Sequence, residues 1–314
     1  TFSSRGLGDV YKRQVDVTLD AAAIGDASDL TTLSTDIRTL GGGTAELDLT
    51  NITAITGDFS SLNTIISNSG AVGSNEKFSG IAAQAITAND ATITVDNANT
   101  LSGATTGKVT ATVATGSLAT LNGLSAAAQP ANGDAFALTL NDTSVDAGDL
   151  ATLDSKVDQA GGGSINMNTV VKLTGTLTEA QTFITTKDNF TNNSNVVDID
   201  LSGTIGDAAA VDTLSTDIRA LSGGTAEINL TGVTAISGTF AQLETIIDDS
   251  GAVGSNSKFS GVAAQALTED SGGTISVANA NKLSGATTGK VTATITTGSL
   301  ATLNGLSAAA QPAN

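Results

Sequence analysis

The sequence predicts an α/β fold, in the form of an open right-handed β-α solenoid of roughly 30-residue strand-helix units with a parallel sheet. Two observations support this prediction. The segment "GATTGKVTATVATGSLATLNGLSAAAQPAN" at residues 103–132 returns at residues 285–314 with only two of its 30 positions changed. In addition, stretches in which every other residue is apolar, as in half-buried strands, alternate with stretches that have the apolar spacing of helices.

The duplication divides the chain into segments. The similarity extends back to Val15 and Val197, which makes the long period about 182 residues. We therefore expect a tail at residues 1–14, a first repeat copy at 15–132, intervening strand-helix units of the same solenoid at 133–196, and a second repeat copy at 197–314.

The strands are predicted where apolar residues alternate with polar ones. These stretches are 15–19, 47–49, 109–113, 136–140, 165–167, 197–201 and 228–230. From residue 109 onward they begin roughly 30 residues apart, which is the length of a βαβ unit. The segment 71–90, rich in Gly, Ser and Asn, does not fit this spacing and is predicted to be an inserted loop or a single irregular strand.

Helices are predicted between the strands. Leu30, Leu33, Ile37 and Leu40 fall on one helix face, Asp26 stands ahead of them as an N-cap, and the glycines at 41–43 end the helix. Similar helices are expected at 211–221 behind Asp207, at 59–66 closed by Gly70, at 240–247 closed by Gly251, and at 118–124 and 150–157.

Two architectures accept this order of elements. A crossover helix makes neighbouring strands parallel and right-handed, both in a closed or doubly wound domain and in an open solenoid. The second copy follows without a linker, which favours the solenoid, because each unit of a stack buries its apolar edge on the next.

The composition excludes several function classes. The chain has 31 acidic and 13 basic residues and a net charge of −18, which disfavours nucleic acid and anionic membrane surfaces as partners. It contains no Cys, His or Trp, so disulfides, thiolate or imidazole metal sites and a histidine-activated serine are absent. No apolar run is long enough to span a membrane. We expect no enzyme, and no catalytic, cofactor-binding or metal-ligating residues.

Two patterns resemble known repeat families. "GTAELDLTNITAITGDFSSLNTI" at residues 43–65 loosely resembles a leucine-rich repeat, but it lacks the ladder asparagine. "DAGDLATLDSKV" at 146–157 and "VTATVATGSLATL" at 109–121 resemble the Thr/Ala/Asp-rich tandem repeats of very large surface or secreted proteins of marine bacteria, including cyanobacteria. The resemblance covers residues 15–314 and implies a secreted, cell-surface or extracellular-matrix setting.

Acidic turns are the candidates for ion chemistry. The turns at 140–149 and 248–256 supply oxygen ligands that suit Ca²⁺, but neither has the spacing of an EF-hand loop or of a Gly/Asp nonapeptide repeat. Local hydrogen bonds in turns and helix caps explain these residues better, and weak Ca²⁺ binding to an acidic chain is the alternative. The pairs Asp212 with Asp217 and Asp248 with Asp249 are candidates for acid–base catalysis, and solvated surface charge is the better interpretation.

Other polar motifs carry less information. The threonine runs at 110–116 and 292–298 resemble ice-binding ranks, but they occur once per long period, so outward-facing β-formers explain them. Sequons for N-glycosylation occur at Asn51, Asn141, Asn189, Asn192 and Asn229, and chance alone produces several in such a chain.

The function expected from these features is that of a structural or adhesive repeat segment of a large extracellular or cell-surface protein, a rod-like spacer or coat element. Its partners are neighbouring repeats of the same chain, with surface polysaccharide or other surface proteins as further partners. The alternatives are a polysaccharide- or protein-binding solenoid module and a phage or viral fibre segment.

The first residues differ from the rest. "SRGLGDVYKRQ" at 4–14 holds three of the 13 basic residues and the single tyrosine, and it has no counterpart before the second copy. It resembles the translation of a transposase adapter used in sequencing libraries. Residues 1–14 are therefore interpreted as a read-through artefact, with a disordered tail as the alternative, and the chain as a fragment of metagenomic type.

Overall fold

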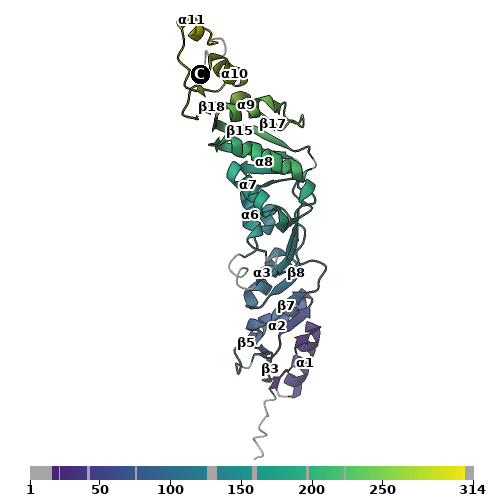
Figure 1. Cartoon of the computed structure of the whole chain (residues 1–314). Coiled ribbons are helices and arrows are strands. Elements are labelled where there is room, and N and C mark those ends of the chain that lie inside the picture. Colours follow the sequence, from purple (N-terminus) through teal and green to yellow (C-terminus); the bar gives the residue numbers. More distant parts are fainter. Residues whose placement is uncertain are drawn as a thin grey trace, which may run out of the picture. The chain divides into compact units, whose positions relative to one another are not determined.

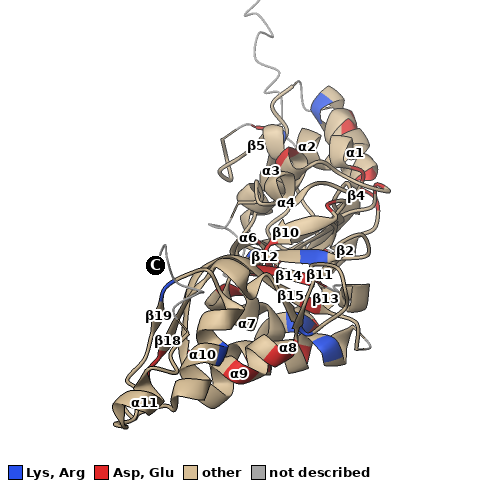
Figure 2. Cartoon of the chain, turned by 90° about the horizontal axis from the view of Figure 1, so that it is seen from above, with Lys and Arg blue, Asp and Glu red and all other residues tan. Residues whose placement is uncertain are grey.

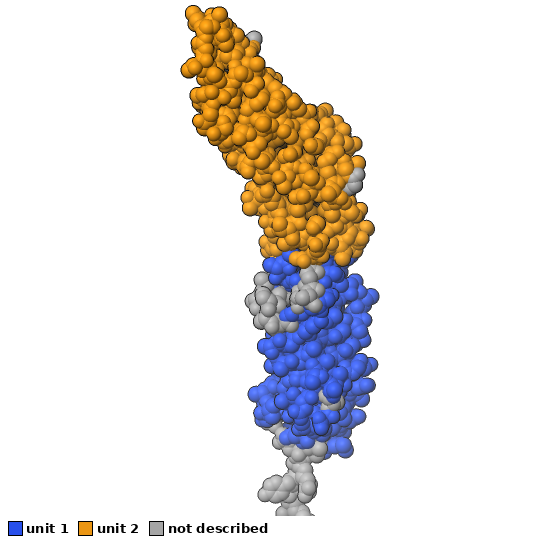
Figure 3. Space-filling view, viewed as in Figure 1, with its two compact units in different colours: residues 1–139, 153–165 blue, residues 140–152, 166–314 orange. Residues whose placement is uncertain are grey.

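The computed structural model describes residues 16–20, 22–40, 43–74, 76–125, 133–157, 161–195, 198–222 and 224–307, and the tail predicted at 1–14 lies outside them. The chain divides into two compact units (Figure 3). Unit 1 comprises residues 1–139 and 153–165, and unit 2 comprises residues 140–152 and 166–314.

Unit 1 combines parallel sheets with a row of helices (Figure 1). One sheet has the strand order β1-β3-β6-β5, and a second contains the order β11-β9-β8-β7-β4-β2. Helices α1, α2 and α3 contact one another in chain order. The elements are β1 Val17–Thr18, β2 Ala23–Ile24, α1 Ala27–Leu40, β3 Leu47–Asp48, β4 Ala54–Gly57, α2 Phe59–Ser67, β5 Ser69–Gly70, β6 Phe78–Ser79, β7 Ala85–Ala88, α3 Val95–Ala104, β8 Val109–Thr112, α4 Leu118–Leu121, β9 Ala135–Thr139 and β11 Ser164–Asn166.

Unit 2 has the same kind of organisation. Its sheet follows the order β10-β12-β14-β15-β17-β16, and β18 pairs with both β15 and β19. Helices α7, α8, α9 and α10 again contact one another in chain order. The elements are β10 Ser144–Asp146, α6 Ala147–Asp154, β12 Lys172–Thr176, α7 Leu177–Thr186, β13 Phe190–Thr191, β14 Asp198–Ile205, α8 Ala208–Leu221, β15 Glu227–Gly238, α9 Phe240–Asp248, β16 Ser250–Gly251, β17 Phe259–Ser260, β18 Ala266–Glu269, α10 Val277–Ala286, β19 Val291–Thr292 and α11 Leu300–Leu303.

Most paired strands lie one strand-helix step apart in the chain, whereas the pairs β5–β6 and β16–β17 are separated by a loop alone. Val17 pairs with Leu47, and Leu47 in turn pairs with Phe78 in the next step. The step is shorter where a compact helix connects the strands, as between Ile86 and Val109. The strand pairs with a described register are all parallel. The fold class is therefore α/β with parallel sheets, as the sequence predicts.

Matching segments of the two copies form matching helices. Helices α1 and α8 have 14 residues each, α2 and α9 have nine, and α3 and α10 have ten. The strands differ more, because the positions of β3 and β4 in unit 1 correspond to the single 12-residue strand β15 in unit 2.

The core consists of small aliphatic side chains and a few phenylalanines. Leu47 on β3, Ile55 on β4 and Ile86 on β7 of unit 1 are fully buried, as is Phe136 on β9. Parallel strands covered by helices need apolar residues on their inner face, and the alternating pattern provides them. In unit 2, Phe259 occupies the same core position as Phe78 in unit 1.

The predicted N-caps are confirmed, and two predicted helix ends are wrong. Asp26 Oδ1 accepts from the backbone N–H of Ser28, and Asp207 Oδ1 from that of Ala209, both at 2.9 Å. Gly70 and Gly251 do not close helices. Helix α2 ends at Ser67 and α9 at Asp248, and both glycines lie in short parallel strands after the helices.

The predicted helix face of α1 is also corrected at its end. Ala27, Leu30, Ser34 and Ile37 are the buried residues of α1, whereas Leu40 is 82% exposed. Leu40, the fourth residue of the pattern, is the last residue of α1.

The prediction of an inserted loop or single strand at 71–90 is wrong. The segment contains two strands, β6 and β7, separated by a 3-10 turn at Ile81–Ala83. Gly80 has a φ of +77°, and a Cβ atom there would lie 2.6 Å from the backbone nitrogen of Thr50. The glycine thus permits a sharp bend between two buried strands, and this bend interrupts the alternating pattern.

Several elements had no predicted counterpart. Helices α3 and α10 contain Asn, Ser and Gly and have few apolar side chains, but Thr94 and Ser276 cap their N-termini. Strand β12 and helix α7 were also missed. Among the described residues, every helix is too short or too polar to cross a lipid bilayer.

Candidate functional site

A group of polar side chains crosses three neighbouring strands of unit 2, and we call it the charged ladder. Lys172 on β12 is in register with Asp198 on β14, which is in register with Glu227 on β15. Lys172 Nζ lies 3.0 Å from Asp200 Oδ2, and Asn229 Nδ2 donates to Asp200 Oδ1 at 3.1 Å. The strands are thus connected by side chains as well as by backbone hydrogen bonds.

Two groups of the charged ladder have shifted pKa values. Burial raises the pKa of Asp198, and the negative charge of Glu227 acts in the same direction. The hydrogen bond to Asp200 raises the pKa of Lys172. A raised carboxyl pKa is one attribute of a general acid, but catalysis also needs access for a substrate. Asp198 instead accepts a hydrogen bond from the backbone of Glu227 on the adjacent strand.

Glu227 is buried and holds a loop. Both of its carboxylate oxygens accept from the backbone N–H of Gly254, at 2.9 and 3.1 Å, and Ser260 Oγ donates to Oε1 at 2.6 Å. The matching Glu46 of unit 1 accepts from the N–H of Gly73 at 3.0 and 3.1 Å. These carboxylates have the same structural role in both copies, because they anchor the Gly- and Ser-rich loop that precedes β6 or β17.

The predicted carboxylate pairs do not form as pairs. Lys258 Nζ lies 2.8 Å from Asp249 Oδ2 and 3.8 Å from Asp212 Oδ1. Lys282 Nζ lies 2.8 Å from Asp248 Oδ2. Asp248 and Asp249 therefore contact different lysines, and the spacing of Asp212 and Asp217 along α8 places them on different faces of the helix.

Lys282 of α10 lies on the helical surface of unit 2, beside acidic residues of α9 (Figure 2). Lys282 also contacts Glu244 Oε1 at 2.7 Å, so α9 and α10 are connected by two ion pairs that share one ammonium group. The side chains of Lys282 and Glu244 are 34% and 38% exposed. At this exposure, solvent screens each pair and its contribution to stability is small.

The acidic turns considered for Ca²⁺ contain helix caps and loop contacts. In the turn at 140–149, Asp146 Oδ1 accepts from the backbone N–H of Gly148 and of Asp149, at 2.9 and 3.1 Å. In the turn at 248–256, the acidic residues pair with lysine as described above. No group of three or more Asp and Glu residues that could hold a metal ion occurs among the residues that the structure describes.

The remaining motifs lie at the surface or in strand contacts. Thr292 and Thr294 are exposed and alternate with half-buried positions, as expected for outward-facing strand residues. Asn51, Asn141 and Asn192 are exposed, and Asn189 is half-buried. The Asn229 side chain donates a hydrogen bond to Asp200 and accepts one from the hydroxyl of Thr231.

The buried polar residues Gln84 and Gln265 are not predicted by the apolar patterns of the sequence. Gln84 Nε2 donates to the carbonyl oxygen of Leu49 at 2.9 Å, and Gln265 Nε2 donates to that of Leu230 at 2.8 Å. One signal could have identified them. Each of these glutamines, like Glu46 and Glu227, is retained at the same position of both copies, next to strand residues.

The chain was compared with protein-family models, with curated protein sequences and with solved structures, and none of the three comparisons gave a match.

Proposed function

We propose that the chain is a structural or adhesive repeat segment of a large extracellular or cell-surface protein, in which an open β-α solenoid acts as a spacer or coat element. The observation that supports this proposal is the parallel pairing of strands that follow one another at steps of one strand-helix unit. In such a stack each unit contacts its neighbours, so the length can grow by duplication.

The polar groups support the same proposal. The buried carboxylates and glutamines anchor loops, and the lysine–carboxylate pairs connect adjacent helices. The secreted setting and the marine-bacterial repeat class rest on the sequence resemblance alone.

A polysaccharide-binding module is less well supported. Carbohydrate sites commonly present exposed aromatic rings, which offer a flat apolar face beside polar groups. The seven phenylalanines that the structure describes are buried or half-buried, and the sequence has no Trp. The chain therefore offers a sugar no exposed aromatic platform within the described residues.

The test is the longer reading frame that contains this sequence, followed by cell fractionation. We expect further copies of the long period together with a secretion signal or an anchoring domain. An antibody raised against the chain should then label intact cells or the medium. An adjoining catalytic domain, or a product confined to the cytosol, would overturn the proposal.

A further inference from the structure

The C-terminal edge of unit 2 exposes apolar side chains that are buried at the matching place in unit 1. Leu300 is 76% exposed and Leu306 is 44% exposed. Their counterparts Leu118 and Leu124 are 6% and 2% exposed, although the local sequences are nearly identical. The difference therefore comes from what covers these residues, and not from the residues themselves.

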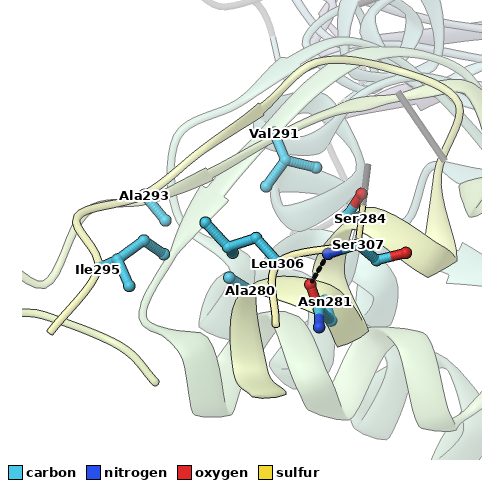
Figure 4. A pocket seen from close by; sticks show the side chains of 8 residues that line it. All are labelled: Ala280, Asn281, Ser284, Val291, Ala293, Ile295, Leu306 and Ser307. Carbon is cyan, nitrogen blue, oxygen red and sulfur yellow. Dashed lines mark hydrogen bonds between the residues drawn. The ribbon is translucent and has the colours of Figure 1, made fainter. Parts of the chain in front are cut away.

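The exposed face has a definite lining. Leu306 projects between Val291, Ala293 and Ile295 of the β19 segment on one side and Ala280 of α10 on the other (Figure 4). These residues and three polar ones surround a hollow of about 220 Å³. Asn281 Oδ1 accepts from the backbone N–H of Ser307 at 2.8 Å, which fixes the segment that carries Leu306.

In unit 1 the matching face is covered by the chain that follows it. Strand β9 pairs with β8 in parallel, with Ala111 opposite Phe136. The backbone N–H groups of Val113 and Gly116 donate to the carbonyl oxygens of Ala137 and Thr139, at 3.0 and 3.1 Å. The neighbouring Asp134 is fully buried and accepts from the backbone N–H of Val109 at 2.7 Å.

More of the following chain contributes to this cover. Lys156 donates to the carbonyl oxygen of Asn122, next to the α4 leucines. Strand β19 has a partner on one edge only, β18, within the described residues, and it is two residues long where β8 has four. Strand β19 thus has nearly the same sequence as β8, which pairs on both edges, but in the described part of the chain it is itself paired on one edge only.

We infer that the face formed by α10, β19 and α11 is a docking surface for a strand-helix segment of the sequence type found at residues 133–157. The occupant is specified by the chain itself, because β9 and the segment with Lys156, which belong to this stretch and to unit 1, cover the near-identical face there. An apolar strand such as β9 would bury Leu306 and pair with the free edge of β19. The inference rests on the stacked architecture of the proposed function, but not on the extracellular setting.

The experiment uses the full chain and an extended chain in which a second copy of residues 133–157 follows Asn314. Residues 308–314 have the same sequence as residues 126–132, so the connection matches the one in unit 1. A control extension carries Phe136→Asp and Leu138→Asp in the appended copy only. Hydrogen–deuterium exchange is measured at residues 291–306, with residues 109–124 as the internal reference.

We expect exchange at residues 291–298 to slow by about tenfold or more in the extended chain but not in the control, because pairing protects strand amides. The binding of an apolar dye should fall in parallel. Equal exchange in the parent and extended chains would overturn the inference, and so would equal protection by the control extension.

A second pair of variants covers the case in which the extension does not fold. In the parent chain, Leu306→Asp should leave the Tm nearly unchanged, whereas Leu124→Asp should lower it, because only Leu124 is covered. Leu306→Asp should also abolish the capture of a synthetic peptide of residues 133–157 by the parent chain. If no saturable capture is seen before the substitution, the inference fails, while the cell-fractionation test of the proposed function is unaffected.

Discussion

At the scale of single residues, the two copies place the same side chain in different environments. Ser79 and Ser260 occupy matching positions, and both are fully buried. Ser260 Oγ donates to the buried carboxylate of Glu227 at 2.6 Å. Ser79 Oγ has no hydrogen-bond partner among the described residues. A comparison of Ser79 with Ser260 therefore separates the contribution of a buried hydrogen bond to stability from the contribution of a buried hydroxyl group without one.

Replacement of each serine by alanine should have unequal effects. Ser260→Ala removes a hydrogen bond to a charged group and should lower the free energy of unfolding by about 2 kcal/mol. Ser79→Ala removes an unpaired buried hydroxyl and should be neutral or slightly stabilising. Urea unfolding followed by circular dichroism measures both variants. Equal losses for the two would contradict the assigned hydrogen bond.

At the scale of elements, neighbouring strands of unit 2 place like charges opposite each other. Asp198 on β14 and Glu227 on β15 are in register, and the pKa of Asp198 is raised by burial and by this neighbour. The folded chain therefore binds this proton more tightly than the unfolded chain does. Its contribution to stability is complete below the ordinary aspartate pKa and is lost as the pH rises through the raised value.

Asp198→Asn should consequently stabilise unit 2 at neutral pH. The amide keeps an acceptor for the backbone N–H of Glu227 and removes the repulsion, a gain of about 0.5 kcal/mol. The gain should disappear at pH 3, where the aspartate is protonated in both states. Thermal unfolding at pH 3 and pH 7 measures it. Asp188→Asn serves as the control, because the Asp188 side chain is 91% exposed. A gain that is the same at both pH values would refute the assignment.

The elements also show which parts of the fold can be predicted from patterns in the sequence. Helices α1 and α8, of 14 residues each, are predicted because most of their apolar residues fall on one face. Strands β6 and β7 were missed because each is short and Gly80 turns the chain between them. A bend of this kind depends on the close approach of Thr50, which belongs to the preceding strand-helix unit and is invisible to a local pattern.

The candidate site was less predictable than the fold. The charged ladder depends on register, since Lys172, Asp198 and Glu227 belong to three successive strand-helix units and meet only in the sheet. The carboxylate pairs predicted from neighbouring positions were separated by lysines from other elements, such as Lys258 and Lys282. Sequence spacing predicts side-chain neighbours within one helix or strand, whereas these contacts join different elements.

At the scale of the whole molecule, net charge is the dominant electrostatic property. The chain carries 31 acidic and 13 basic residues, and within the part of the chain that the structure describes three lysines form ion pairs of 3.0 Å or less. Carboxylates thus greatly outnumber their cationic partners, and their mutual repulsion opposes the compact state. Exposed ion pairs contribute little, so salt should relieve more repulsion than it removes attraction.

Raising the NaCl concentration from 20 to 300 mM should therefore stabilise the chain. We expect a gain of about 1 kcal/mol, which corresponds to roughly 2–4 °C in Tm for units of this size. Differential scanning calorimetry measures it, and CaCl₂ at matched ionic strength is the control. Screening predicts the same rise for both salts, because it depends on ionic strength. MgCl₂ at the same ionic strength is the second divalent control, and a larger rise with CaCl₂ than with both NaCl and MgCl₂ would reveal a specific Ca²⁺ site. A fall in Tm with NaCl would show that attractive pairs outweigh the repulsion.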